Sequence, residues 1–382
     1  MRATTVNNAL AANPSNYHNF VMTGSVSASG VVMSLLDSTL HSKILRGNNT
    51  LNSLFKGCAA LIRAPRLGFY RFGGTLACAY MFQDCTGLVD IPALDIQVMG
   101  YQSCVSMFKG CTALVNAPYI NTTINHNSCG NMFENCTSLV NANNITLCGA
   151  TKGYDFSAMF KNCSSLRTIP HFNVTYDIID ATFESTFEGC TSLVDASSLI
   201  IKQQNGTLKN SFSGCSSLQY PPHIEFNGIA GYGFYHTFQN CISLVDARNI
   251  SAVGNFYKHA LEGAFAGCAS LKYPPALTMN DAIEEQTWVA AFSNCSSLEE
   301  ITLDFPATSS TQWQSTTFQY CLMNCSAITD ITITWEEWPS TIGSQFSWPN
   351  KNRVTLHVKP TLDISSLTTY NIPSSWTVVQ DA

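Results

Sequence analysis

Apolar and polar positions along this chain of 382 residues recur in one phrase, Phe-x-Gly/Asn-Cys-Ser/Thr-x-Leu. Phe108, Cys111 and Leu114 fill its three fixed places in one copy, and later copies follow at steps of roughly 26 residues. A repeat of this length predicts a solenoid, in which one small structural unit is stacked many times. The phrase occurs again around Phe160, Cys163 and Leu166. Its cysteines, each taken as position 0 of a repeat, are Cys58, Cys85, Cys111, Cys136, Cys163, Cys190, Cys215, Cys241, Cys268, Cys295 and Cys325.

The residues before each cysteine predict a short helix. Positions −7, −3 and 0 are apolar together, and this i, i+4, i+7 spacing is typical of one face of a helix. Position −3 is Phe in every repeat except the last, which has Leu322. Position −1 is Gly, Asn or, once, Asp84, which are the residue types that tolerate the left-handed conformation at a helix end. We therefore expect a helical turn that ends just before each cysteine.

The residues after each cysteine predict a short strand. Position +3 is Leu in every repeat but the last, which has Ile328, and positions +6 and +9 are mostly small or apolar. Proline at position +7 in six repeats limits the strand, because proline donates no ladder hydrogen bond. Near the end of the chain, Ile301–Leu303 and Ile331–Ile333 alternate strictly, as strands do. Together these patterns predict an α/β repeat solenoid of about eleven rungs, each a short strand plus a short helix.

Both ends of the chain lack the repeated phrase, and open solenoid ends need caps. Residues 1–50 are predicted to be an N-terminal cap or docking segment, with a strand within residues 26–36. The solenoid is assigned to residues 51–330, and residues 331–382 to a C-terminal cap. The C-terminal part holds four of the six tryptophans, a predicted strand over residues 353–358 and a possible helical turn over residues 363–370.

Composition limits the class of protein. Only 12% of the residues are charged and the formal net charge is −6, so no basic footprint for nucleic acid is present. No apolar run approaches the length of a membrane span, and the first residues lack the apolar core of a secretory signal. We expect a chain that neither spans a membrane nor is exported by the general secretory route.

The sixteen cysteines favour buried, reduced thiols over disulfides or zinc ligands. The anchors all occupy one place in the repeat and should form a column. A second column at position −7 contains Cys78, Cys104 and Cys129, where other repeats have Leu, Phe or Trp. Cysteine that exchanges with large apolar residues behaves as a small buried hydrophobe. No Cys-x-x-Cys pair suggests zinc or redox chemistry.

The segment Met107-Phe-Lys-Gly-Cys-Thr-Ala-Leu-Val-Asn-Ala-Pro118 resembles the BspA-like leucine-rich repeats, in particular those of gut Bacteroidetes and their phages. The opening at residues 30–36 and the tail from Val354 to Trp376 are also similar to that family, so the resemblance covers roughly residues 25–382. It implies a leucine-rich-repeat fold and a surface-binding or adhesion role, without naming a target. The chain departs from the family in lacking an export signal or lipoprotein cysteine, and in its more variable intervening segments.

Residues with catalytic potential are sparse. The sequence has no P-loop, no His-Glu-x-x-His and no Gly-x-Ser-x-Gly, and we expect no enzyme, cofactor or metal. His171 and His223 share position +8, but two rungs, or about 10 Å, would separate them. Asp90, Asp195 and Asp246 share position +5, where a solvated face that keeps strand edges soluble is the simpler interpretation.

The better candidate for function is an exposed face that also carries Tyr119, Tyr220 and Tyr273, beside the same histidines and aspartates. Solenoids bind along such faces, and aromatic and amide groups suit contact with protein or glycan. Scattered surface aromatics are an equally simple interpretation. The leading hypothesis is a non-enzymatic phage virion surface protein (a head or tail decoration or fibre component), assembled in the host cytoplasm, which binds a host surface or other virion proteins. The alternative is a bacterial or protozoan cell-surface adhesin, and a homo-oligomer is possible in either case.

Overall fold

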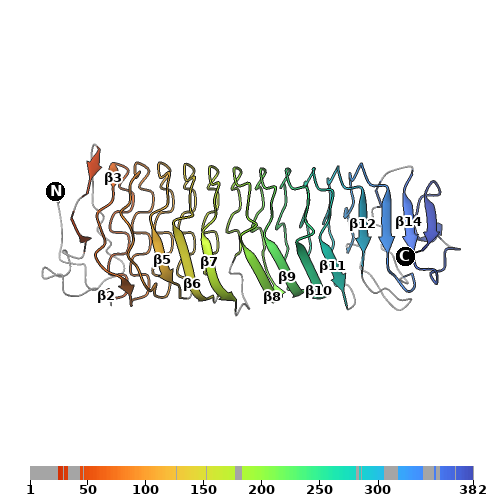
Figure 1. The fold of residues 1–382 in the computed structure, drawn as a ribbon, viewed down its shortest axis with the longest axis horizontal. Coiled ribbons are helices and arrows are strands. Elements are labelled where there is room, and N and C mark those ends of the chain that lie inside the picture. The colour runs from red at the N-terminus through yellow and green to blue at the C-terminus, as the bar shows by residue number, and fades with distance from the viewer. Residues whose placement is uncertain are drawn as a thin grey trace. The chain divides into compact units, whose positions relative to one another are not determined.

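The computed structural model describes residues 25–28, 30–32, 44–45, 47–125, 127–151, 153–176, 183–280, 284, 286–304, 317–338, 348–349, 353–365 and 367–381. The chain divides into two compact units, Met1–Leu193 and Val194–Ala382. Within each unit, strands far apart in the sequence run parallel and lie side by side (Figure 1). The predicted solenoid is therefore confirmed as a parallel β-solenoid.

The described residues of unit 1 form three small parallel sheets. Strand β1 (Val26–Ser27) pairs with β3 (Leu61–Arg63), and β2 (Ile44–Leu45) pairs with β4 (Arg71–Phe72). The third sheet contains β5 (Ile120–Thr123), β6 (Ile145–Thr151) and β7 (His171–Tyr176), in that order. In its register Ile120 lies opposite Ile145, 25 positions later, so consecutive repeats stack in phase.

In the part of unit 2 that the structure describes, the strands form two four-stranded parallel sheets. The first has the order β11-β10-β9-β8 and the second β12-β13-β14-β15. The predicted strands at residues 301–303 and 331–333 are present within β12 and β13, and the expected helical turn near residue 370 is the 3-10 helix η2 (Leu367–Tyr370). The strands are β8 (Ile200–Gly206), β9 (His223–Ile229), β10 (Ile250–Phe256), β11 (Ala276–Met279), β12 (Glu300–Leu303), β13 (Asp330–Ile333), β14 (Thr355–Val358) and β15 (Thr377–Gln380).

The helix predicted before each cysteine is wrong, and with it the α/β description. Among the described residues no α-helix is present, and these segments are runs of turns. Asn127, Asn131 and Asn135 illustrate the difference, with φ angles of 54°, 56° and 61°. An α-helix cannot continue through left-handed residues, which cost roughly 1–2 kcal/mol each for L-amino acids. A left-handed residue at every fourth position instead closes one tight turn after another.

Hydrogen bonds in these runs alternate between two directions. Phe133 N donates to Met159 O in the next rung at 2.8 Å, whereas Glu134 N donates back to Asn131 O at 3.1 Å. Alternate amides therefore join the rungs, while those between them close turns. Because both sets have acceptors, the buried backbone is satisfied without a helix.

Columns of identical side chains fill the core. In unit 1 the ring of Phe133 stacks on Phe108 and on Phe160, with centroids 5.4 Å apart in both cases, and Phe160 stacks on Phe187 at 5.7 Å. Phe212, Phe238, Phe265 and Phe292 form the equivalent stack in unit 2. The repeat residues Phe108, Cys111, Leu114, Phe160, Cys163 and Leu166 are all fully buried. Burial of each large apolar side chain contributes roughly 1.5–3 kcal/mol.

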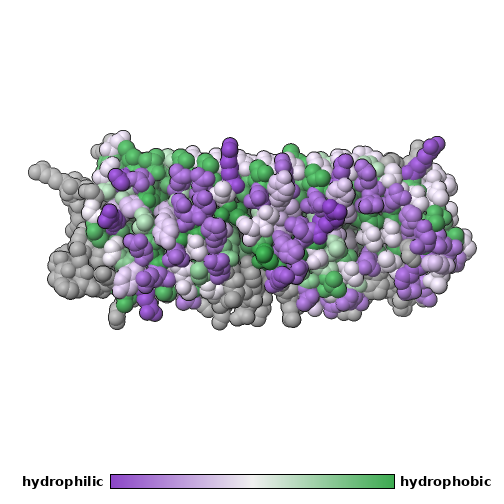
Figure 2. All heavy atoms as spheres, viewed as in Figure 1, coloured by the Kyte–Doolittle hydropathy of each residue, from purple (hydrophilic) through white to green (hydrophobic). Residues whose placement is uncertain are grey.

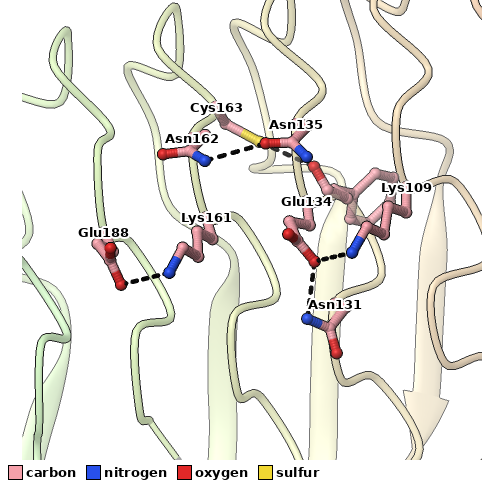
Figure 3. Close-up of polar contacts among 9 residues, drawn as sticks. Lys109, Asn131, Glu134, Asn135, Lys161, Asn162, Cys163 and Glu188 are labelled. Carbon is pink, nitrogen blue, oxygen red and sulfur yellow. Dashed lines mark hydrogen bonds and ion pairs between the residues drawn. The ribbon is translucent and has the colours of Figure 1, made fainter.

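All sixteen cysteines are free thiols, and all but Cys148 are buried, as the sequence predicted. The anchor thiols also donate hydrogen bonds: Cys163 Sγ lies 3.0 Å from Phe133 O in the preceding rung (Figure 3). Burial raises the pKa of Cys85 to about 12 and raises that of Cys268 to about 12. These thiols are therefore protonated donors at neutral pH.

Position −1 is left-handed in every repeat, as its residue types predicted, although it ends no helix. The φ angles there range from 58° at Asp84 to 78° at Gly267. Where asparagines follow one another they form a ladder, with Asn162 Nδ2 donating to Asn135 Oδ1 at 3.0 Å (Figure 3). At Gly189 a Cβ atom would lie 2.6 Å from Asn162 Oδ1, so a larger residue there would require the Asn162 side chain to move.

Tryptophans are packed into the C-terminal end of unit 2. Trp335, Trp338, Trp348 and Trp376 are all buried. Trp348 Nε1 donates to Tyr370 O at 3.0 Å, which ties η2 to the segment before β14. The limits proposed for the two caps stay predictions, and residues 1–24 and 33–43 of the expected N-terminal cap lie outside the described residues. No helix in the described ranges has the length and apolar character needed to cross a membrane.

Candidate binding face

Position +5 forms an exposed column beside the strands. In unit 2, Asp195 forms a parallel β-bridge with Tyr220, and Asp246 forms one with Tyr273, each between consecutive rungs. Aspartate and tyrosine therefore alternate in this column from Asp195 to Tyr273. Figure 2 shows mainly hydrophilic residues on the visible face, with apolar residues between them.

The aspartates of this column have a local structural role. Asp195 Oδ1 accepts from Ser197 N at 2.8 Å, and Asp246 Oδ1 accepts from Arg248 N at 3.0 Å. In both repeats position +7 is not proline, so its amide needs an acceptor. In the repeat of Asp90, position +7 is proline, and the carboxylate instead pairs with Arg63 at 2.8 Å. Each of the three carboxylates thus already has a partner.

Arg248 completes a fixed cluster with Asp246 and Tyr273. Its Nη2 lies 2.6 Å from Asp246 Oδ2 and its Nε 3.0 Å from Asp246 Oδ1. The guanidinium also stacks over Tyr273, with Cζ 4.4 Å from the ring centroid. Hydrogen bonding from Arg248 lowers the pKa of Asp246, so the pair stays ionised at neutral pH. The cluster is held because one edge of the guanidinium bonds Asp246 while its face stacks on Tyr273.

A shallow groove of about 980 Å³ lies next to this cluster in unit 2. Tyr220 stands in it with 57% of its surface exposed. Asn249 supports one side, since its Nδ2 donates to Pro221 O at 2.9 Å and to Pro222 O at 3.1 Å. The groove is lined by Ser197, Gln219, Tyr220, Pro221, His223, Ser243, Val245, Asp246, Arg248 and Asn249.

His223 at the groove belongs to a short charged chain. Its Nε2 lies 2.7 Å from Glu225 Oε1, and the same carboxylate binds Lys202 at 2.7 Å through its other oxygen. The hydrogen bonds from Lys202 and then His223 lower the pKa of Glu225. The carboxylate therefore stays ionised and fixes the position of the His223 ring.

The eight candidate residues of the face fall into two groups. Asp195, Tyr220, His223, Asp246 and Tyr273 lie in or beside the groove of unit 2. Asp90, Tyr119 and His171 lie exposed in unit 1. Since His171 and His223 belong to different units, the separation predicted for them stays a prediction. Within the described residues, no group of three or more His, Cys, Asp or Glu side chains is placed to hold a metal ion.

Sequence reasoning missed Arg248 and Asn249. The available signal was the Asp-x-Arg spacing of Asp246 and Arg248 followed by a tyrosine one repeat later. This spacing predicts a contact between the arginine and the tyrosine only once the rungs are known to stack in register.

Comparison with known proteins gives no family for the chain: no protein-family model and no curated protein matches it.

Proposed function

We propose that this chain is a non-enzymatic binding protein that presents the groove of unit 2 at the surface of a larger particle. The observation that carries the proposal is Tyr220, a large side chain with 57% of its surface exposed beside the fixed Asp246–Arg248–Tyr273 cluster. Tyrosine and arginine are the residue types enriched where binding energy is concentrated.

The scaffold supports binding because it is already ordered. The Tyr220 amide donates a hydrogen bond to Val194 O of the preceding rung at 3.2 Å, and the Tyr273 amide donates one to Val245 O at 3.1 Å. A partner would therefore order little additional backbone, and that part of the entropic cost of binding is correspondingly small.

The particle we propose is a phage virion, with the chain as a head or tail decoration or fibre component that contacts a host surface or another virion protein. Support for this placement comes from the likeness of the repeated phrase to BspA-like repeats of gut Bacteroidetes and their phages. A cellular surface adhesin would use the same groove, so the two proposals differ in where the chain is found.

Quantitative mass spectrometry of phage particles purified through a density gradient tests the placement. The proposal predicts that peptides of this chain sediment with the particles in a fixed ratio to the major capsid protein. Particles without these peptides, together with surface labelling of the chain on intact uninfected cells, would overturn the virion placement in favour of the adhesin.

A further inference from the structure

We propose that the groove of unit 2 binds an uncharged glycan, with one sugar ring lying against Tyr220. This inference rests on the proposed binding function and names the ligand class of the same site.

Charge is the first argument for an uncharged ligand. Asp246 and Arg248 are the two residues with fixed charges that line the groove, and they neutralise each other through paired hydrogen bonds. The nearby Glu225 is likewise bound to Lys202. An anionic or cationic ligand would find no unpaired charge of opposite sign here, whereas a neutral one loses nothing by the pairing.

The polar groups of the lining are the second argument. Ser243 supplies a hydroxyl and Gln219 an amide, each of which can both donate and accept, whereas the Ser197 hydroxyl donates to Asp195 at 2.6 Å and is left as an acceptor. Arg248 uses Nε and Nη2 for Asp246, which leaves the donors of Nη1 for a ligand. A ring that carries several hydroxyls matches this mixture of short-range donors and acceptors.

The apolar surface beside these groups is the third argument. Tyr220 exposes 57% and Val245 41% of their surfaces, and Pro221 lies beside them in the lining. One face of a pyranose ring consists of C–H groups, which pack on an aromatic ring while the hydroxyls at its edge form hydrogen bonds. The groove combines both kinds of surface around one tyrosine.

The test applies the purified full-length chain to an array of neutral, sialylated and sulfated oligosaccharides, and then measures affinity for the neutral ligands by titration calorimetry. We expect binding to neutral oligosaccharides that Tyr220→Ala weakens at least about tenfold. Tyr154→Ala, a matched loss of a tyrosine that is 51% exposed in unit 1 and lies outside the candidate face, should leave affinity unchanged. Absence of neutral ligands, or binding that Tyr220→Ala leaves intact in a folded protein, overturns the inference.

A second arm separates this inference from the proposed function. The chain is incubated with host bacteria before and after periodate oxidation of their surface sugars. Binding that is lost on oxidation and in Tyr220→Ala supports the glycan. Binding that survives oxidation but is lost in Tyr220→Ala overturns the glycan and keeps the binding function, with a protein as the partner. Failure to bind cells, oligosaccharides or virion proteins at all overturns the proposed function itself.

Discussion

The anchor cysteine combines the packing of a small apolar side chain with the donor capacity of a thiol. Phe133 O accepts both the Cys136 amide at 3.1 Å and the Cys163 thiol at 3.0 Å. A carbonyl oxygen has two lone pairs, so both bonds can form together. Alanine or valine would lack the second donor, which explains why the position is cysteine and not another small hydrophobe.

Thiol reactivity should follow burial. Of the sixteen cysteines only Cys148 is partly exposed, and burial raises the pKa of anchors such as Cys325, to about 12. The thiolate is the reactive species, so alkylation of the native protein by iodoacetamide should modify Cys148 first and the others only on unfolding. Peptide mass spectrometry measures this, and Cys148→Ser should abolish the early reaction. Rapid alkylation of several anchors would contradict the buried column.

The phenylalanine stack makes a quantitative prediction. Phe160 is fully buried between Phe133 and Phe187, with centroids at 5.4 and 5.7 Å. Phe160→Ala should destabilise the protein by about 3–5 kcal/mol, because the removed ring leaves a cavity. Urea unfolding measures the change, and Tyr119→Ala, at an exposed position, should stay within about 0.5 kcal/mol of wild type. Wild-type stability of Phe160→Ala would refute the column.

At the scale of the element, a glycine substitution can distinguish the run of turns before each cysteine from a helix. Ala290 has φ 50°, a strained angle for an L-residue, whereas the adjacent Ala291 lies outside the left-handed region and is buried. Ala290→Gly should relieve strain of about 1–2 kcal/mol, offset by roughly 0.4–1 kcal/mol of added chain entropy in the unfolded state. The net effect is a small stabilisation.

In a helix the same change would cost about 1 kcal/mol. Thermal unfolding of Ala290→Gly and of the control Ala291→Gly therefore gives opposite signs if the turns are present. The control should lower the melting temperature because it removes a buried methyl group. A lower melting temperature for both variants would favour a helix.

The last strands of unit 2 predict a pH-dependent contribution to stability. His357 on β14 lies 2.8 Å from Asp381 and 3.3 Å from Asp330, and Glu300 faces the same hollow. Hydrogen bonding to Asp381, with help from Asp330, raises the pKa of His357 above its ordinary value despite partial burial. The charged histidine therefore stabilises the folded state fully below about pH 6, and this contribution is lost as pH rises through the raised pKa.

His357→Gln should accordingly melt below wild type near pH 5.5, with the difference shrinking toward pH 8. Melting temperatures of both proteins across this range provide the test. A constant difference at all pH values would mean that the histidine acts through packing and not through its charge.

At the scale of the whole molecule, the sequence predicted that the rungs stack, but it did not predict the backbone conformation within each rung. The period of the anchors fixes which residues meet between rungs, so the burial of Phe160 and Cys163 followed from the sequence. The i, i+4 spacing does not distinguish a helix from successive four-residue turns. Both Asn131 and Ala290, at position −5, are left-handed, but only the asparagine is of a residue type that signals this conformation.

The candidate face could likewise be predicted only in part from the sequence. Exposure of Tyr119 and Tyr220 could be inferred from their places in the repeat, since neither replaces a core residue. The cluster beside the groove could not be inferred, because it depends on the arginine of one rung stacking over the tyrosine of the next, as Arg248 does over Tyr273. Contacts of this kind depend on side-chain direction, which the period alone does not determine.

In a solenoid, stability comes from contacts between neighbouring rungs, and the outward side chains remain available to bind partners. The most direct test is binding of the Tyr220→Ala, Arg248→Ala double variant to host cells, measured beside its melting temperature. We predict a melting temperature close to wild type and binding weakened at least about tenfold. A folded double variant that binds as tightly as wild type would contradict the assignment of recognition to this groove.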